Sequence, residues 1–443
     1  MPESARTVDQ RLSPRRAFVN ARLLDPATGL DAPGALLSEG TRILDVGPRV
    51  MNEAMAEGAE IVDCGGRCLA PGLIDMRVHL REPGDEHKET ITTASKAAAA
   101  GGVTAMVCLP NTEPAVDNVS VVEFIARRAR ETNIVKIYTY GTVTRGFKGR
   151  EMTEMGIMSQ AGALGFTDGT HAVADALVMR RALAYAKTFG LLIIQHPEEP
   201  SLAGNGVMTE GEIATRLGLP GIPACAELMM IERALRLVEL TDGRYHAAHI
   251  STAESVEVIR RAKQRGLDVT CDTAPPYFTL NENAVGEYRT FAKLSPPLRC
   301  EEDRAAIVEG LADGTIDAIA SDHAPHDQES KRLPFIQAES GMIGLETLLP
   351  LSLALYHGKK LPLLKVLALL SNRPGELLNL KEGTLKPGQP ADLVIFEPDR
   401  PWRTDPTKFH SKSKNTLFED YPVQGRVSRT VVGGRTVFER PES

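Results

Sequence analysis

Eight apolar segments, separated by amphipathic ones, constrain the fold of this 443-residue chain more than any other feature. Segments with helical periodicity lie between them, for example at 87–100, 119–132 and 253–265. Apolar strands that alternate with helices are typical of βαβ units, and eight of them match a closed (β/α)₈ barrel better than an open sheet, because no G-x-G-x-x-G motif follows the first strand. We therefore predict an α/β fold with a barrel over about residues 72–375. The eight segments end near His79, Pro110, Tyr140, Asp168, His196, His249, Asp272 and Asp322.

Both ends of the chain have a different texture, with short β-like runs separated by Asp, Pro and Gly turns. The runs AFVNARLL at 17–24 and ADLVIFEP at 391–398 read as strands, and Gly433-Gly434 lies between two β-branched runs in a hairpin pattern. We expect residues 1–71 and 376–443 to form one small composite β-domain beside the barrel.

Composition and charge exclude several classes of function. The net charge of −7 offers no basic surface for nucleic acid, and no apolar run approaches the roughly 20 residues that a membrane span needs. The first 16 residues are polar and lack the apolar segment of a signal peptide. Six scattered cysteines read as core or strand residues in a reducing compartment. These features predict a cytoplasmic protein that acts on a small molecule.

Besides the one that ends near Asp272, five of the predicted strands end on a histidine or an aspartate. In (β/α)₈ barrels the carboxyl ends of the strands meet at one mouth, where active sites lie. Any single such residue is more often a cap or a loop hydrogen bonder, but five together favour a site. Three histidines and two carboxylates are ligands that a zinc-like divalent ion recruits. The five residues are His79, Asp168, His196, His249 and Asp322.

The motifs around these residues resemble those of class I dihydroorotase, in the amidohydrolase superfamily. The first is GLIDMRVHLREPG at 72–84 and the last is AIASDHAPHD at 318–327. Between and after them come PNTEP at 110–114, GALGFTD at 162–168, QHPEE at 195–199, YHAAHIST at 245–252, LSPPLR at 294–299 and GTLKPGQPADLVIFEP at 383–398. The resemblance covers nearly the whole chain. Hydantoinases and allantoinases share the same barrel fold, so the resemblance defines the fold more closely than the substrate.

This resemblance implies a role for each matching residue. His79, His196, His249 and Asp322 correspond to metal ligands, and Asp322 also to the group that shuttles the proton. Arg81, Asn111 and His326 correspond to the groups that hold the substrate's carboxylate and ring carbonyls. The chemistry agrees, since a guanidinium offers a planar fork to a carboxylate and an amide both donates and accepts. The activity implied is the reversible cyclisation of N-carbamoyl-L-aspartate to L-dihydroorotate in pyrimidine biosynthesis.

Two departures from the family pattern affect the metal. Arg77 stands where the first histidine of H-x-H is expected, and a guanidinium does not ligate a divalent ion. The bridging carboxylate is replaced by Gly169, and neighbouring Asp168 can substitute only if the loop rotates, because adjacent strand residues point to opposite faces. Four ligands remain, which predicts one zinc ion rather than two. Ser295 and APPY at 274–277 are smaller departures.

Three hypotheses follow from these residues. The first is an active dihydroorotase that uses the residues named above. The second is a non-catalytic dihydroorotase-like subunit that supports aspartate carbamoyltransferase, which Arg77 and Gly169 favour; the chain is then a homo-oligomer or part of that complex. The third is another cyclic amidase. If the metal is lost, we expect the guanidinium of Arg77 to reach Asp322 or another acid at the mouth and occupy the vacant place.

Overall fold

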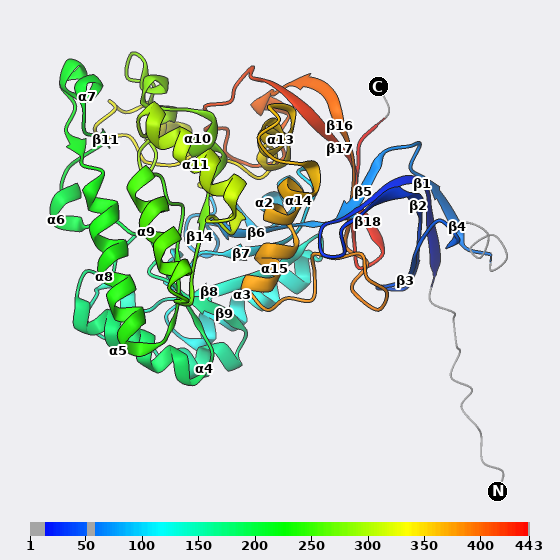
Figure 1. Cartoon of the computed structure of the whole chain (residues 1–443), viewed down its shortest axis with the longest axis horizontal. Coiled ribbons are helices and arrows are strands. Elements are labelled where there is room, and N and C mark those ends of the chain that lie inside the picture. Colours follow the sequence, from blue (N-terminus) through cyan, green and yellow to red (C-terminus); the bar gives the residue numbers. More distant parts are fainter. Residues whose placement is uncertain (1–13, 51–57, 442–443) are drawn as a thin grey trace, which may run out of the picture.

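The computed structural model of the protein describes residues 14–50 and 58–441. It contains a helix-covered barrel and, beside it, a mixed β-sheet (Figure 1). The sheet takes strands from both ends of the chain, in the order β18-β17-β16-β5-β1-β2-β3 with β4 paired to β1. Its strands are β1 (Arg15–Asp25), β2 (Leu30–Glu39), β3 (Arg42–Gly47), β4 (Glu60–Asp63), β5 (Cys68–Pro71), β16 (Leu393–Arg403), β17 (Pro422–Val432) and β18 (Arg435–Glu439).

The two ends join through one antiparallel pairing, in which β16 runs beside β5 from Leu393↔Pro71 to Phe396↔Cys68. The expected hairpin is present, with Gly433-Gly434 between β17 and β18. The prediction of a β-rich unit made from both termini is therefore confirmed. Residues 1–13 of that predicted unit lie outside the described residues, and its exact boundaries stay a prediction.

The middle of the chain forms the predicted barrel. Its parallel strands follow the order β15-β14-β13-β10-β9-β8-β7-β6, and a parallel bridge between Val78 and His323 joins the two outermost strands. All eight sequence segments correspond to strands. The strands are β6 (Leu73–Val78), β7 (Val103–Cys108), β8 (Lys136–Gly141), β9 (Ala163–Phe166), β10 (Leu192–Gln195), β13 (Arg244–Ala247), β14 (Val269–Thr273) and β15 (Ala318–Ile319).

Helices cover the outside of these strands (Figure 1). The longer ones are α2 (Ile91–Ala100), α3 (Val119–Thr132), α5 (Ala176–Thr188), α8 (Cys225–Thr241), α9 (Ala253–Gln264), α11 (Glu301–Asp313), α13 (Leu348–His357) and α14 (Leu363–Leu370). Shorter elements are α4 (Met155–Gln160), α6 (Pro200–Ala203), α7 (Glu212–Leu217), α10 (Pro275–Thr279), α12 (Gln328–Arg332), α15 (Asn372–Leu377), β11 (Met208–Thr209) and β12 (Gly221–Ile222).

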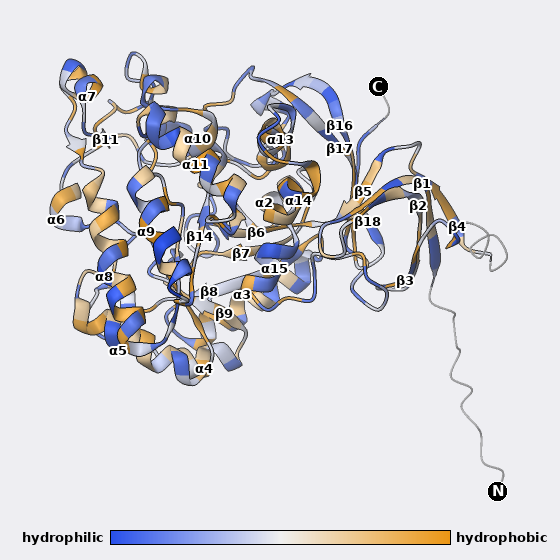
Figure 2. Cartoon of the chain, in the orientation of Figure 1, coloured by the Kyte–Doolittle hydropathy of each residue, from blue (hydrophilic) through white to orange (hydrophobic). Residues whose placement is uncertain are grey.

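Local sequence explains where these helices begin and which face they bury. Thr90 caps α2 by accepting from the Thr93 amide, and Thr252 caps α9 by accepting from the Ser255 amide. The buried face of α9 includes Val256 and Ile259. The helices around the barrel carry both hydrophobic and hydrophilic residues (Figure 2), as expected of helices with one face on the core. Strands β6, β7 and β10 are buried along their whole length, as expected of a parallel sheet between helices and a filled barrel interior.

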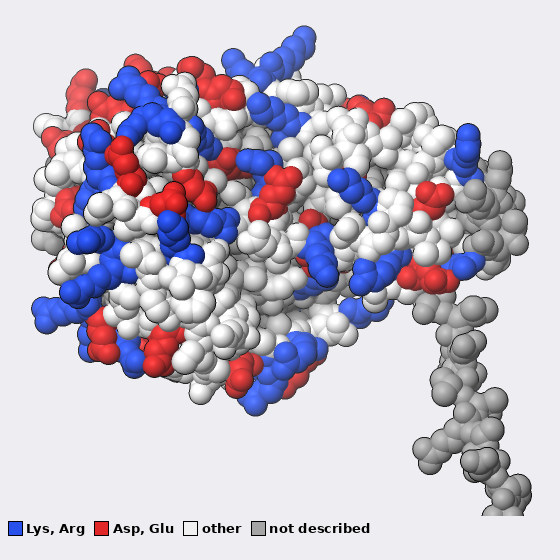
Figure 3. Space-filling view, turned by 60° about the horizontal axis from the view of Figure 1, so that its bottom comes forward, with Lys and Arg blue, Asp and Glu red and all other residues white. Residues whose placement is uncertain are grey.

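The outer surface has no single-signed field on the face shown in Figure 3, where Lys and Arg side chains are interspersed with Asp and Glu. Within residues 14–50 and 58–441, no helix is both long enough and apolar enough to cross a membrane.

Candidate active site at the barrel mouth

The mouth of the barrel gathers the residues expected to carry chemistry, each placed by the end of a strand. His79 follows β6, His196 follows β10, His249 follows β13 and Asp322 follows β15. The three histidines are at most 5% exposed. His249 and Asp322 have φ values of 38° and 51°, a left-handed conformation that costs non-glycine residues free energy. Such strain is often retained where side chains must be aimed into a site.

Three of these residues form a continuous chain of polar contacts that begins at Arg77. The Arg77 Nε donates to Asp322 Oδ1 at 2.8 Å, and Asp322 Oδ2 lies 3.0 Å from His249 Nδ1. His249 Nε2 lies 2.7 Å from His196 Nδ1. Because a carboxylate only accepts, His249 Nδ1 carries its proton, so in a neutral ring Nε2 accepts from His196.

Charge and burial act together on the ionisation of this chain. Burial raises the pKa of Asp322, but neighbouring His249 and Arg77 outweigh it and hold that pKa well below its usual range. Burial, followed by the charge of Arg77, lowers the pKa of His249 to about 4. For His79, burial and the nearby Arg81 and Arg77 lower the pKa well below its ordinary value. At neutral pH the site thus holds an anionic Asp322 beside a guanidinium, and the imidazoles of His249 and His79 are neutral.

Arg77 lies inside the barrel and not on its rim. Its side chain is only 2% exposed, its Nη2 lies 3.5 Å from the Gly169 carbonyl oxygen, and its Nη1 has no hydrogen-bond partner among the described residues. The expected contact between Arg77 and Asp322 is therefore present. A buried charge is tolerated when it is paired, as this guanidinium is.

Gly169 and Asn111 are in close contact on the other side of the guanidinium. A Cβ atom on Gly169 would lie 1.6 Å from Asn111 Oδ1, and the glycine has φ +68°, where an L side chain is strained. Asn111 Oδ1 is itself buried without a partner in the described part of the chain. Only a glycine at position 169 is compatible with Asn111 in this position.

Asp168 does not take over the role of the missing bridging carboxylate. Its Oδ1 accepts from the backbone amides of Val143 and Thr144 at 2.9 Å, and its Oδ2 from the Thr144 hydroxyl. The side chain thus ties the end of β9 to the segment after β8.

Arg81 and His326 lie together, apart from Asn111. Arg81 Nε donates to the Pro325 carbonyl at 3.1 Å, and its Nη2 lies 3.2 Å from His326 Nε2. That nitrogen is also 2.9 Å from the Ser340 carbonyl oxygen, so it carries the ring proton, and the buried Nδ1 is an acceptor without a described partner. Burial, together with the charges of Arg81 and Lys331, lowers the pKa of His326 to about 2. The expected substrate groups thus form two clusters.

The four expected zinc ligands do not fit a metal ion as they are arranged. His196, His249 and Asp322 are bound to one another, and the second carboxylate oxygen of Asp322 is bound to a guanidinium. Within the described residues, no three His, Cys, Asp or Glu side chains are grouped so that they could hold a metal ion. A dication beside Arg77 would also meet like-charge repulsion in a buried place.

Other residues near the mouth did not emerge from the sequence as site residues. Glu198, in the QHPEE segment, lies 3.7 Å from His196 Nε2, and Ser295 Oγ lies 3.5 Å from the same nitrogen. His246 does not join this chain of contacts, because its Nε2 is 2.8 Å from Asp272 Oδ2.

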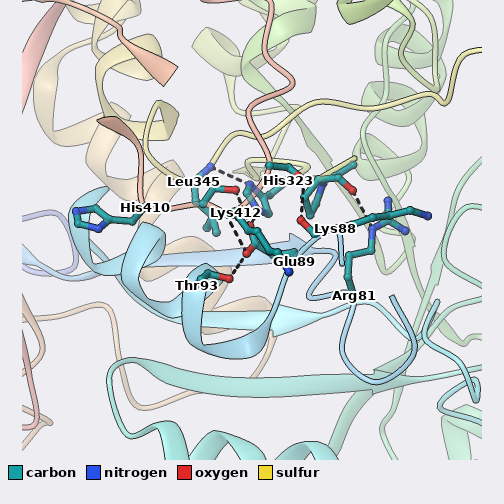
Figure 4. Close-up of polar contacts among 12 residues, drawn as sticks. Arg81, Lys88, Glu89, Thr93, His323, Leu345, His410 and Lys412 are labelled. Carbon is teal, nitrogen blue, oxygen red and sulfur yellow. Dashed lines mark hydrogen bonds and ion pairs between the residues drawn. The ribbon is translucent and has the colours of Figure 1, made fainter. Parts of the chain in front are cut away.

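A second polar cluster supports the mouth from behind Asp322. His323 is fully buried, and its Nδ1 accepts from the Gly344 amide at 3.1 Å, which leaves the proton on Nε2, 3.6 Å from Glu89 Oε2. Glu89 also accepts from Ser411 Oγ and the Lys412 amide, and Figure 4 shows it between Thr93, Lys412 and His323. The His323 carbonyl in turn accepts from the His79 amide at 2.9 Å. This cluster connects β6, β15 and the C-terminal segment.

Comparison with known proteins relates the whole chain to one group of enzymes. Family models described as Dihydro-orotase-like and Amidohydrolase family match residues 66–255 and 228–438. Two proteins named dihydroorotase, from Anaplasma phagocytophilum and Syntrophotalea carbinolica, are 48% and 47% identical over 95% of this chain and over 95% and 98% of their own lengths. The solved L-hydantoinase (dihydropyrimidinase) of Arthrobacter aurescens has a TM-score of 0.84 at 25% identity and covers 96% of both chains. The dihydropyrimidinase of Brevibacillus agri, 22% identical, has a TM-score of 0.82 and shows the same fold.

Proposed function

We propose that this chain, which belongs to the dihydroorotase family of the amidohydrolase superfamily, acts on N-carbamoyl-L-aspartate and L-dihydroorotate at the mouth of its barrel. The family is one of cyclic amidohydrolases, and its members generally depend on a metal ion. One observation supports the proposal: Asp322 after β15 contacts Arg77 of β6, and His326 lies against Arg81, so segments far apart in the sequence bring these groups together at the ends of the strands. The reaction belongs to pyrimidine biosynthesis.

In this proposal the cationic and amide groups bind the substrate. Arg81 donates one N–H to the Pro325 carbonyl and keeps its other guanidinium N–H groups for a carboxylate, and two parallel bonds to a carboxylate favour arginine over lysine. Asn111 has an unpartnered buried oxygen, which can accept from a ring N–H. These two groups are expected to bind opposite parts of the same cyclic ligand.

Asp322 is the group placed to move a proton. In the hydrolytic direction, water oxygen bonds to the ring amide carbon, the ring C–N bond breaks, and the leaving nitrogen gains a proton. A carboxylate at the mouth can take the proton from water and return it to that nitrogen. One zinc ion was predicted from the sequence to activate the water, but because the residues do not fit it, no step of this scheme depends on a metal.

A second function is favoured by the hydrogen bonds that both oxygens of the Asp322 carboxylate already make. Arg77 and His249 bind its two oxygens at 2.8 and 3.0 Å, so the proposed base has no oxygen without a protein partner. A dihydroorotase-like subunit that binds and supports aspartate carbamoyltransferase would retain the fold and not need a free base. For either function we propose a cytoplasmic location and an assembly, with copies of itself or with that enzyme.

Turnover by the purified chain distinguishes the two functions. We expect hydrolysis of L-dihydroorotate by the wild type and its loss in Asp322→Asn, since an amide cannot take up the proton. Circular dichroism verifies that the variant is folded. Dihydrouracil, which lacks the carboxylate, is the matched control substrate, and its equal turnover would favour another cyclic amidase. If the wild type and variant are equally inactive, and aspartate carbamoyltransferase co-elutes with the chain, the supporting function is correct.

Replacing Arg81 by lysine tests the substrate-binding group. The variant keeps the charge and loses the planar fork, so we expect dihydroorotate to bind more weakly by about 1–3 kcal/mol. Isothermal titration calorimetry measures this without requiring turnover. Arg332→Lys, on the exposed end of α12, is the matched control and should leave the affinity unchanged. An unchanged affinity in the Arg81 variant would remove Arg81 from this role.

A further inference from the structure

We propose that Arg77 supplies the positive charge which a metal ion supplies elsewhere in this family, so that the barrel mouth of this chain takes up no divalent ion. The identity of the ligand rests on the proposed function. The absence of a metal ion is inferred from the geometry of Arg77, Asp322 and Gly169 alone. It contradicts the zinc ion that the four remaining ligands predicted.

The first step concerns the aspartate that a metal would need. Asp322 Oδ1 accepts from Arg77 Nε at 2.8 Å, and Oδ2 is the partner of His249. The guanidinium is 2% exposed, so little water is present to screen its charge. A buried guanidinium keeps its proton, which makes this cation permanent. A metal could use Asp322 only after expelling Arg77 from the barrel interior.

The second step concerns the loop after β9, whose backbone and packing fit the guanidinium of Arg77. The Gly169 carbonyl oxygen lies 3.5 Å from Arg77 Nη2 and faces the guanidinium with a partial negative charge. Where a bridging acid would need a Cβ atom, Asn111 Oδ1 is only 1.6 Å away. The space for a second metal ligand is therefore filled. Arg77 and Gly169, which both depart from the family pattern, thus have one joint effect: a guanidinium occupies the place of a metal ion.

The third step concerns what the converted site still lacks. Among the described residues, Arg77 Nη1, His79 Nδ1 and Asn111 Oδ1 are buried without a hydrogen-bond partner. Buried polar groups are costly unless they are paired, so three of them at one mouth indicate a bound ligand. Arg77 Nη1 can donate to an oxygen of that ligand, the role that a metal ion would otherwise have. An anionic cyclic ureide offers both the oxygen and the N–H groups required.

The metal content of the purified chain tests the proposal directly. Wild type is dialysed against EDTA, incubated with excess ZnCl₂, separated from free ion by gel filtration, and analysed by plasma mass spectrometry. We expect well below one zinc per chain, and the same residual content in His196→Ala, because adventitious binding does not depend on the mouth. One equivalent of zinc in the wild type that disappears in His196→Ala would overturn the proposal.

Arg77→His and Arg77→Lys form the matched pair of variants. The histidine removes the fixed charge and adds a ligand beside His79, so zinc content should rise to about one equivalent and ZnCl₂ should raise the melting temperature. The lysine keeps a cation and should stay metal-free. A folded Arg77→His variant as metal-free as the wild type would show that Arg77 is not what excludes the ion.

Turnover in the same samples separates this inference from the proposed function. Activity that survives EDTA supports both. Activity that EDTA abolishes and zinc restores supports the function and overturns the inference. Calorimetric binding of dihydroorotate to inactive, zinc-free wild type, weakened at least tenfold in folded Arg77→Met, would support the inference and overturn the catalytic function. Equal affinity in Arg77→Met and wild type would overturn the role of Arg77 towards the ligand.

Discussion

Replacing Gly169 by aspartate is expected to destabilise the protein and not to restore a bridging ligand. The backbone at Gly169 has φ +68°, which costs an L residue roughly 1–2 kcal/mol. In addition, the new Cβ would lie 1.6 Å from Asn111 Oδ1, and overpacking a buried position costs about 1–3 kcal/mol more. We therefore expect a loss of about 2–5 kcal/mol in the free energy of unfolding, measured by urea denaturation.

Two variants separate the contributions to this loss. Gly190→Asp places aspartate at φ +65° with no atom within 4 Å, so it should show only the backbone cost. Asn111→Ala removes the clashing amide, so the double variant Gly169→Asp with Asn111→Ala should recover most of the packing cost. A Gly169→Asp variant no less stable than Gly190→Asp would mean that Asn111 moves aside freely. Restoring the bridging carboxylate, as distinct from a single-ion site, therefore requires a change at position 111 together with the one at 169.

The barrel could be predicted from the sequence because its strands are short, apolar and regularly spaced. Strands near His79, His196 and His249 end within two residues of the positions expected, since a polar residue follows the buried run where the chain leaves the barrel. The strand β2 was not predicted, because Pro33 and Gly34 interrupt its pattern and normally indicate a turn. Pairing with both β1 and β3 outweighs that local preference.

The candidate site could be predicted only as a set of residues at one mouth. Strand ends and family motifs predicted that Asp322, His249 and His196 lie at the same mouth. The sequence also indicated that Arg77 could reach Asp322 or another acid there. The sequence could not show that Asn111 contacts Gly169, because this contact joins the loops that follow β7 and β9, two strands that have β8 between them. Nor could it show that both oxygens of Asp322 are bound, which depends on rotamers and not on sequence spacing.

Removing the guanidinium of Arg77 is expected to destabilise the protein strongly. Arg77→Met keeps much of the buried volume but leaves Asp322 with one partner, and breaking a buried ion pair costs about 3–5 kcal/mol. Because the Asp322 side chain is 19% exposed, we expect the lower end of this range, near 3 kcal/mol, by urea denaturation at pH 7. Arg332→Met, at the exposed end of α12, is the surface control and should change stability by less than about 0.5 kcal/mol.

The double variant Arg77→Met with Asp322→Asn tests whether charge is the cause. It removes the unpaired carboxylate, so it should be more stable than Arg77→Met alone by about 1–3 kcal/mol. The pH dependence has a definite sign. Asp322 has a folded pKa held below its unfolded value of about 4, so the pair stabilises the protein above that pH and loses its contribution as the pH falls. The difference between wild type and Arg77→Met should therefore shrink on acidification below about pH 4. A difference that stays constant with pH, with no recovery in the double variant, would mean that Arg77 stabilises the barrel by packing alone and that its charge does not bind Asp322.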